Sequence, residues 1–220
     1  MLNNLASSNL PLINNLLKDT WGHVGYNNEW VIVSSVDLTS ATIQEINSWY
    51  IDTVQKTLAC FSTFARPWKI VIIPHYESEG KLVSIRWQEN TTQVDFINEV
   101  INCVQNYSFL IQELEIKVDL NVFVKTLNSS DILQKNWIRC GDEIVICGEL
   151  KDIDCYMYLS LKHTLFDSDT CELEKDNNEL HFLNQPLLEQ SLKFWEYQFG
   201  SITEFDGYGS IYKYGFLPHS

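Results

Sequence analysis

Hydrophobic residues in the first half of the chain follow two different spacings. Apolar positions that recur every three or four residues predict helices over residues 40–64 and 92–106, and Thr92 with Asp95 resembles a capping box at the start of the second. Apolar runs and strict alternation predict strands, because successive strand side chains point to opposite faces. The predicted strands are residues 30–36, 68–73, 81–87 and 114–124. The elements therefore follow the order strand, helix, strand, strand, helix, strand.

This order predicts an α+β fold in which an antiparallel sheet carries helices on one face. We predict a ferredoxin-like βαββαβ core over residues 28–125, in which the strands 68–73 and 81–87 pair as a hairpin. The first two strands have no polar face, which indicates that another part of the chain covers the open side of the sheet. Residues 126–220 are the expected cover, as a C-terminal extension that packs on the core, so that residues 1–220 form a single domain.

The segments outside this core carry shorter patterns, and each predicts one element. They are a leading helix at residues 11–21, a helix at 131–137, a hairpin of strands 143–147 and 155–161 around a turn at 151–154, an acidic loop at 167–179, a helix at 186–199 and an aromatic tail at 205–218. We therefore predict that the extension is a β-hairpin followed by a helix.

Acidic residues outnumber basic ones by 29 to 15, which gives the chain a formal net charge of −14. Nucleic-acid binding needs clustered lysines and arginines, and the three arginines, Arg66, Arg86 and Arg139, are far apart in the sequence. The same charge disfavours anionic membrane surfaces, and no segment is as long and apolar as a membrane span. We therefore predict no nucleic-acid partner and no membrane partner.

The six cysteines form no C-x-x-C pair, and the first twenty residues lack the basic and apolar regions of a signal peptide. Both features favour a reducing compartment, in which buried thiols stay reduced. We expect a cytoplasmic protein without a cofactor.

Histidines are the first candidates for catalysis or metal binding. His75 follows a predicted strand, where active-site residues are often found, but no nucleophile can be linked to it. His163, Asp167 and Asp169 offer one nitrogen and two carboxylates, yet their spacing matches no metal-binding signature. We therefore predict no catalytic residue and no metal.

The leading hypothesis is a non-enzymatic protein-binding factor, of the inhibitor or immunity type, for a basic partner protein. Carboxylates would steer the encounter, and desolvated tyrosines would hold the complex. The residues expected at this interface are Asp167, Asp169, Glu172, Glu174, Tyr208, Tyr212 and Tyr214. One alternative is a small hydrolase or ligand-binding enzyme with a pocket between core and extension, which uses His75 or the pair His163 and Asp167. Another is a homo-oligomeric scaffold joined through an edge strand or the aromatic tail.

Overall fold

The computed structural model describes residues 23–88, 90–126, 129–148, 155–168, 177–207 and 210–218. Within these ranges the chain forms an antiparallel sheet and three helices, α1 (Ile43–Phe61), α2 (Gln93–Gln105) and α3 (Asn178–Phe199), which confirms the predicted α+β class. None of these helices is long and apolar enough to cross a membrane. The predicted leading helix at 11–21 and the predicted turn at 151–154 lie outside the described residues.

Helices α1 and α2 begin near the predicted positions because each opens with a capping box. The side chain of Thr42 accepts a hydrogen bond from the Glu45 N–H at 3.3 Å, and the Glu45 carboxylate accepts one from the Thr42 N–H at 2.8 Å. Thr92 and Asp95 form the same reciprocal pair at the start of α2. These bonds satisfy backbone donors that a helix start otherwise leaves without partners.

One antiparallel sheet contains strands from both halves of the chain. Its strands are β1 (His23–Val33), β2 (Ala65–Pro74), β3 (Val83–Arg86), β4 (Ile111–Thr126), β5 (Ser129–Ile138), β6 (Glu143–Cys147), β7 (Tyr156–His163) and β8 (Ile202–Asp206). The strand order is β3-β2-β4-β6-β7-β1-β8, every pair is antiparallel, and β5 pairs with the far end of β4. The predicted hairpins β2–β3 and β6–β7 are both present. A separate short hairpin, β9 (Ile211–Tyr212) and β10 (Gly215–Phe216), follows β8.

The pairing of β1 differs from that of a ferredoxin-like core. In that core the first strand lies beside the other strands of the βαββαβ unit, whereas here β1 lies between β7 and β8. The C-terminal segment, expected as a cover, instead contributes β6 and β7 to the sheet between β4 and β1. The order of elements within residues 28–125 was predicted correctly, but element order does not determine which strands become neighbours.

The helix predicted at residues 131–137 is wrong, because this segment forms β5. Leu133 and Trp137 are four residues apart, a spacing that places two side chains on one face of a helix and also on one face of a strand. The ambiguity is resolved by the partner strand. Lys125 lies opposite Leu133 and Asn121 lies opposite Trp137, so β4 supplies the backbone hydrogen bonds that hold this segment extended.

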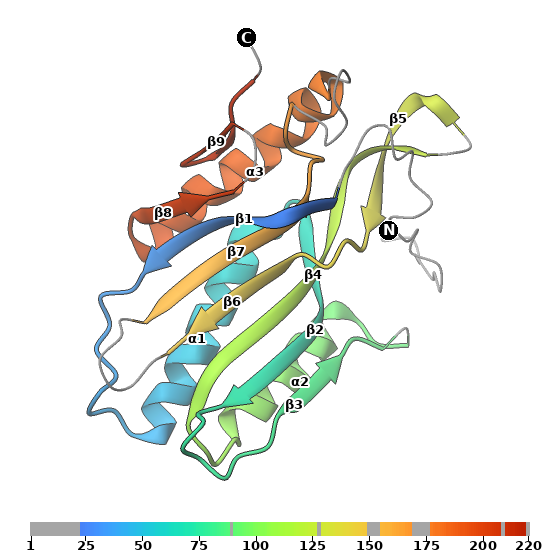
Figure 1. Ribbon diagram of the computed structural model, residues 1–220. Coiled ribbons are helices and arrows are strands. Elements are labelled where there is room, and N and C mark those ends of the chain that lie inside the picture. Colours follow the sequence, from blue (N-terminus) through green and yellow to red (C-terminus); the bar gives the residue numbers. More distant parts are fainter. Residues whose placement is uncertain are drawn as a thin grey trace.

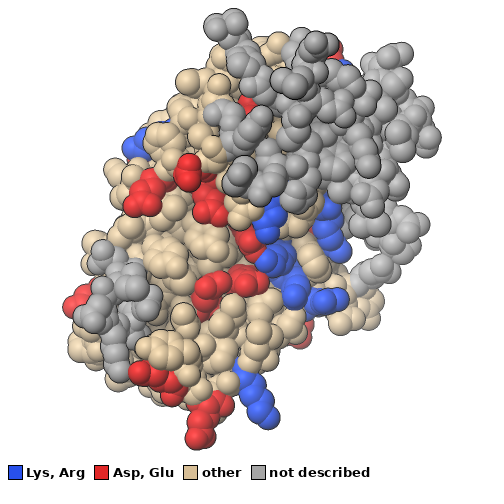
Figure 2. Space-filling view, viewed as in Figure 1, with Lys and Arg blue, Asp and Glu red and all other residues tan. Residues whose placement is uncertain are grey.

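The molecule has two layers. Helices α1 and α2 lie behind the sheet in the view of Figure 1, and α3 packs against α1. Large side chains that are almost fully buried fill the space between the layers; they include Trp30, Ile46, Tyr50, Phe61, Ile70, Phe96, Ile116 and Trp195. The opposite face of the sheet faces the viewer in Figure 2.

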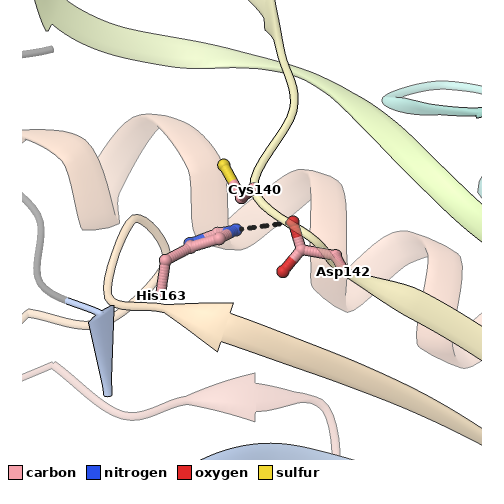
Figure 3. A group of neighbouring side chains, drawn as sticks. All are labelled: Cys140, Asp142 and His163. Atoms are coloured by element: carbon pink, nitrogen blue, oxygen red, sulfur yellow. Dashed lines mark ion pairs between the residues drawn. The ribbon is translucent and has the colours of Figure 1, made fainter. Parts of the chain in front are cut away.

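The turn between β5 and β6 brings two side chains to the end of β7. Gly141 adopts a φ of +85°, which residues with a Cβ rarely adopt, and so allows the chain to turn between Cys140 and Asp142. His163, the last residue of β7, lies next to both of these residues (Figure 3). Three side chains that are distant in the sequence thus meet at one end of the sheet.

Candidate functional site

No described helix covers the face of the sheet opposite α1 and α2. On β4, Leu114, Ile116 and Val118 are buried toward the helices, so the alternating residues Glu113 and Glu115 point to the open face. Figure 2 shows acidic side chains over the middle and left of this face, while most of the basic side chains in view gather on the right. Charge is therefore unevenly distributed across the open face.

Two tyrosines of β7, Tyr156 and Tyr158, stand side by side on the open face. Their rings stack with centroids 6.3 Å apart and planes inclined by 17°. Val145 lies opposite Tyr158 on the neighbouring strand. Its side chain is only 1% exposed, so neighbouring side chains cover it. Both tyrosines are half-buried.

Carboxylates flank the tyrosine pair on three other strands. Glu113 and Glu115 belong to β4 and Glu29 to β1, and the exposed β8 places Asp206 opposite Glu29. Burial raises the pKa of Tyr158, and the negative charges of Glu113 and Glu29 raise it further. The acidic-tyrosine patch is defined as Glu29, Glu113, Glu115, Tyr156, Tyr158, Glu204 and Asp206.

Ionisation of Glu113 is unfavourable in this patch. Partial burial raises the pKa of its carboxyl group, and the nearby Glu115 raises it further. The Cys147 thiol donates a hydrogen bond to the Glu113 carboxylate, with the sulfur and oxygen 3.6 Å apart, and Lys117 offsets the shift in part. An additional cation at this position would stabilise the ionised form of Glu113.

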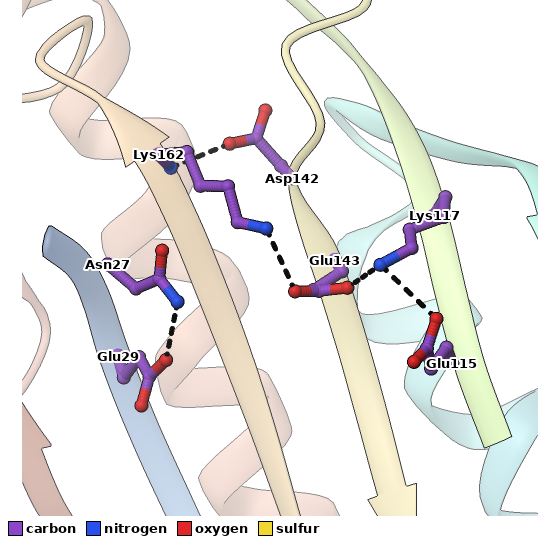
Figure 4. Close-up of polar contacts among 7 residues, drawn as sticks. All are labelled: Asn27, Glu29, Glu115, Lys117, Asp142, Glu143 and Lys162. Carbon is purple, nitrogen blue, oxygen red and sulfur yellow. Dashed lines mark hydrogen bonds and ion pairs between the residues drawn. The ribbon is translucent and has the colours of Figure 1, made fainter. Parts of the chain in front are cut away.

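Two lysines of the open face, Lys117 and Lys162, are already paired with neighbouring carboxylates (Figure 4). Glu143 of β6 contacts Lys117 on β4 and accepts a bond from the Lys162 Nζ at 3.1 Å on β7. Lys117 also lies 3.3 Å from a carboxylate oxygen of Glu115. Among the described residues, no lysine or arginine forms an ion pair with Glu29, Glu113, Glu204 or Asp206. The acidic-tyrosine patch therefore carries excess negative charge.

Two arginines at the other end of the open face, Arg66 and Arg139, share one buried carboxylate. Asp119 is fully buried and accepts two hydrogen bonds from Arg139, from Nε at 2.7 Å and from Nη2 at 3.0 Å, while the Arg66 Nε lies 3.6 Å away. The guanidinium groups also lie on indole rings, Arg66 on Trp87 and Trp137, and Arg139 on Trp68. This cluster is a cross-link between β2, β4 and the end of β5, in which two guanidinium groups share one carboxylate.

The structure places the residues predicted for partner binding in different environments. Asp167 is 1% exposed and so does not reach the surface. Tyr212 and Tyr214 are half-buried and tied to the body of the protein: the Tyr212 carbonyl accepts a bond from the Trp30 Nε1–H at 2.9 Å, and the Tyr214 hydroxyl donates to Glu196. Asp169, Glu172, Glu174 and Tyr208 lie outside the described residues. Whether any of these residues contacts a partner stays a prediction.

The patch itself was missed at the sequence level, although a signal was present. The alternation of Tyr156 and Tyr158 with the buried Met157 and Leu159 indicates an aromatic outer face of β7. That this face lies near Glu113 follows only from the register of β4, β6 and β7, which the sequence does not show.

The two histidines considered for catalysis have separate surroundings. His75 is almost fully buried, and its Nδ1 accepts a bond from the Glu77 N–H at 3.3 Å. The His163 ring is fully buried, with its Nε2 3.2 Å from the Asp142 Oδ2. The ligand atoms of His163, Asp142 and Cys140 all lie within 4.8 Å of one another, whereas Asp169 of the predicted set lies outside the described residues.

In comparisons with known proteins, no family model, no curated protein and no solved structure matches this chain.

Proposed function

We propose that this chain is a non-enzymatic protein-binding factor that uses the acidic-tyrosine patch to bind a basic segment of another protein. The observation that carries the proposal is the stacked pair Tyr156 and Tyr158, flanked by Glu29 and Glu113, which form no ion pair with a lysine or arginine among the described residues. No two of the described cysteines form a disulfide with each other, which agrees with a cytoplasmic location as part of the same proposal.

The patch has the two components that binding of a basic segment requires. Tyrosine rings supply contact area with few rotatable bonds, so little conformational entropy is lost when a partner packs on them. The exposed Glu204 and Asp206 lie at the rim of the face, where charges mainly accelerate association and select partners of opposite sign. Near the tyrosines, an arriving lysine or arginine would relieve the unfavourable ionisation of Glu113.

A capture experiment with charge-matched variants tests the proposal. The untagged wild type and the variant Glu29→Gln, Glu204→Gln, Asp206→Asn are immobilised and exposed to the native cell extract at low and at high salt. The wild type should retain a basic protein at low salt and lose it at high salt. The variant should bind that protein about tenfold more weakly, because three exposed ion pairs contribute about 0.5 kcal/mol each.

The control carries the same change in net charge on the helix side of the molecule, as Asp52→Asn, Glu99→Gln and Glu189→Gln. These residues lie on α1, α2 and α3, so the control should bind like the wild type. Equal loss in both variants would mean that net charge alone drives capture. Capture of no basic protein at either salt concentration would reject the proposed function.

A further inference from the structure

We propose that Cys140, Asp142 and His163 bind a single zinc ion. The three side chains come from the turn between β5 and β6 and from the end of β7, and they are separate from the acidic-tyrosine patch (Figure 3). The inference does not depend on the proposed function.

Two atoms of this cluster are buried without a hydrogen bond. The Asp142 Oδ2 and the His163 Nε2 belong to fully buried side chains and lie 3.2 Å apart. The His163 Nε2–H is not directed at the Asp142 oxygen, so neither atom has a hydrogen-bond partner among the described residues. Buried polar atoms without a partner are rare and costly. A cation between them satisfies both atoms at once.

The spacing of the two atoms fits a tetrahedral metal. Zinc binds nitrogen and oxygen at about 2.0–2.2 Å, which in a tetrahedral site places two such ligands about 3.3 Å apart. The observed separation between Oδ2 and Nε2 is 3.2 Å. The Cys140 sulfur lies within 4.8 Å of the other two ligand atoms, and a movement of about 1 Å or less brings it to bonding distance.

The surrounding backbone holds the carboxylate for single-oxygen binding. The Lys162 backbone N–H donates to the Asp142 Oδ1 at 2.9 Å, so Oδ1 is engaged and Oδ2 is directed toward the cluster. Hydrogen bonds of this kind orient metal ligands and are a regular part of metal sites. A sulfur, a nitrogen and an oxygen donor together favour zinc over calcium or magnesium, which take oxygen ligands.

The Cys140 thiol must lose its proton when zinc binds. Without a cation, burial raises the pKa of Cys140, and the negative charges of Asp142 and Asp119 raise it further, so the group is a thiol. Zinc binding forms an S–Zn bond and releases that proton to solvent.

The geometry does not fit a catalytic Cys–His–Asp triad, in which the imidazole lies between the thiol and the carboxylate. The His163 Nδ1 instead points to the Leu165 N–H and accepts a hydrogen bond from it at 3.2 Å.

The same Leu165 bond opposes zinc binding. Since Nδ1 is an acceptor, the neutral imidazole carries its proton on Nε2, and zinc at Nε2 requires that this proton moves to Nδ1 and that the Leu165 bond is lost. Loss of this bond also leaves the buried Leu165 N–H without its partner, and the three bonds to zinc must outweigh that cost.

Calorimetry on the untagged, chelator-treated full chain tests the site with zinc chloride as the probe. The wild type should bind one zinc per chain and release one proton, measured from the difference between two buffers of unequal ionisation enthalpy. Cys140→Ser should release no thiol proton and bind at least 10- to 100-fold more weakly, the loss typical even for removal of an outer hydrogen-bond partner. The matched control, Cys103→Ser, changes a half-buried cysteine of α2 and should behave like the wild type.

X-ray absorption on the zinc-loaded wild type needs no variant and therefore covers the case in which Cys140→Ser does not fold. One sulfur at about 2.3 Å with nitrogen and oxygen neighbours at about 2.0–2.2 Å would support the assignment. A zinc shell without sulfur, no stoichiometric binding, or equal loss in Cys140→Ser and Cys103→Ser would overturn it.

Discussion

Single residues on the open face differ sharply in how well their charge is compensated. Asp119 is fully buried yet tightly paired with Arg139 and close to Arg66, whereas Glu113 is half-buried beside another carboxylate. A buried charge with a good partner contributes stability, and one without such a partner reduces it. The two carboxylates therefore lead to opposite predictions.

Replacement of Arg139 by methionine should strongly destabilise the fold. Asp119 would keep only the longer contact to Arg66, and loss of one member of a buried ion pair typically costs about 3–5 kcal/mol. Urea unfolding measures the change. The control is Arg86→Met, because Arg86 is exposed on β3 and its replacement should change the free energy of unfolding by less than about 0.5 kcal/mol. Similar losses in both variants would contradict the role given to Asp119.

Replacement of Glu113 by glutamine should stabilise the protein at neutral pH. The folded-state pKa of Glu113 lies above its ordinary value of 4.5, so the folded chain binds the proton more tightly than the unfolded chain, and stability falls as pH rises through this range. Glutamine removes that loss. The free energy of unfolding of Glu113→Gln should exceed that of the wild type at pH 7, and the difference should shrink toward pH 4; a variant less stable than the wild type at pH 7 would refute this.

At the scale of elements, the helices and most strands were predicted from spacing, but their partners were not. The i, i+3, i+4 spacing on α1 and α2 and the alternation on β4 are local properties of the sequence. The position of β1 beside β7 depends on contacts between residues more than 120 positions apart, such as Trp30 opposite Leu159. For the same reason the sequence identified His163 as a candidate ligand but not its neighbours Cys140 and Asp142.

A single hydroxyl group joins α1 to two strands, which predicts a loss of stability when it is removed. The Tyr50 hydroxyl donates to the Gln112 carbonyl at 2.7 Å and accepts the Gly148 N–H at 2.8 Å. The Gly148 N–H and the Gln112 carbonyl also bond to each other at 3.1 Å, so Tyr50→Phe removes the hydroxyl's bonds without leaving either group unpaired. The change should cost about 1 kcal/mol in thermal or urea unfolding. Tyr76→Phe is the control, because Tyr76 is 73% exposed and its change should be close to neutral. An equally small effect at Tyr50 would show that the hydroxyl does not link these elements.

The molecule as a whole combines a net charge of −14 with one sheet face on which the described helices do not pack. Net charge steers cationic partners from a distance, but it does not determine where they bind. That position is given by the tyrosine pair, since desolvated aromatic side chains contribute most of the binding free energy at protein interfaces. The acidic composition was visible in the sequence, whereas the patch required the sheet register.

Photo-crosslinking from the patch tests the central claim most directly. A photoreactive phenylalanine derivative replaces Tyr158 in one protein and Tyr197 in another, because Tyr197 is a tyrosine on α3 that is 82% exposed and distant from the open face. After irradiation in native extract, position 158 should form an adduct with a basic protein that disappears at high salt, and position 197 should form none. An adduct at position 197 with none at position 158 would contradict the assignment of the open face as the binding surface.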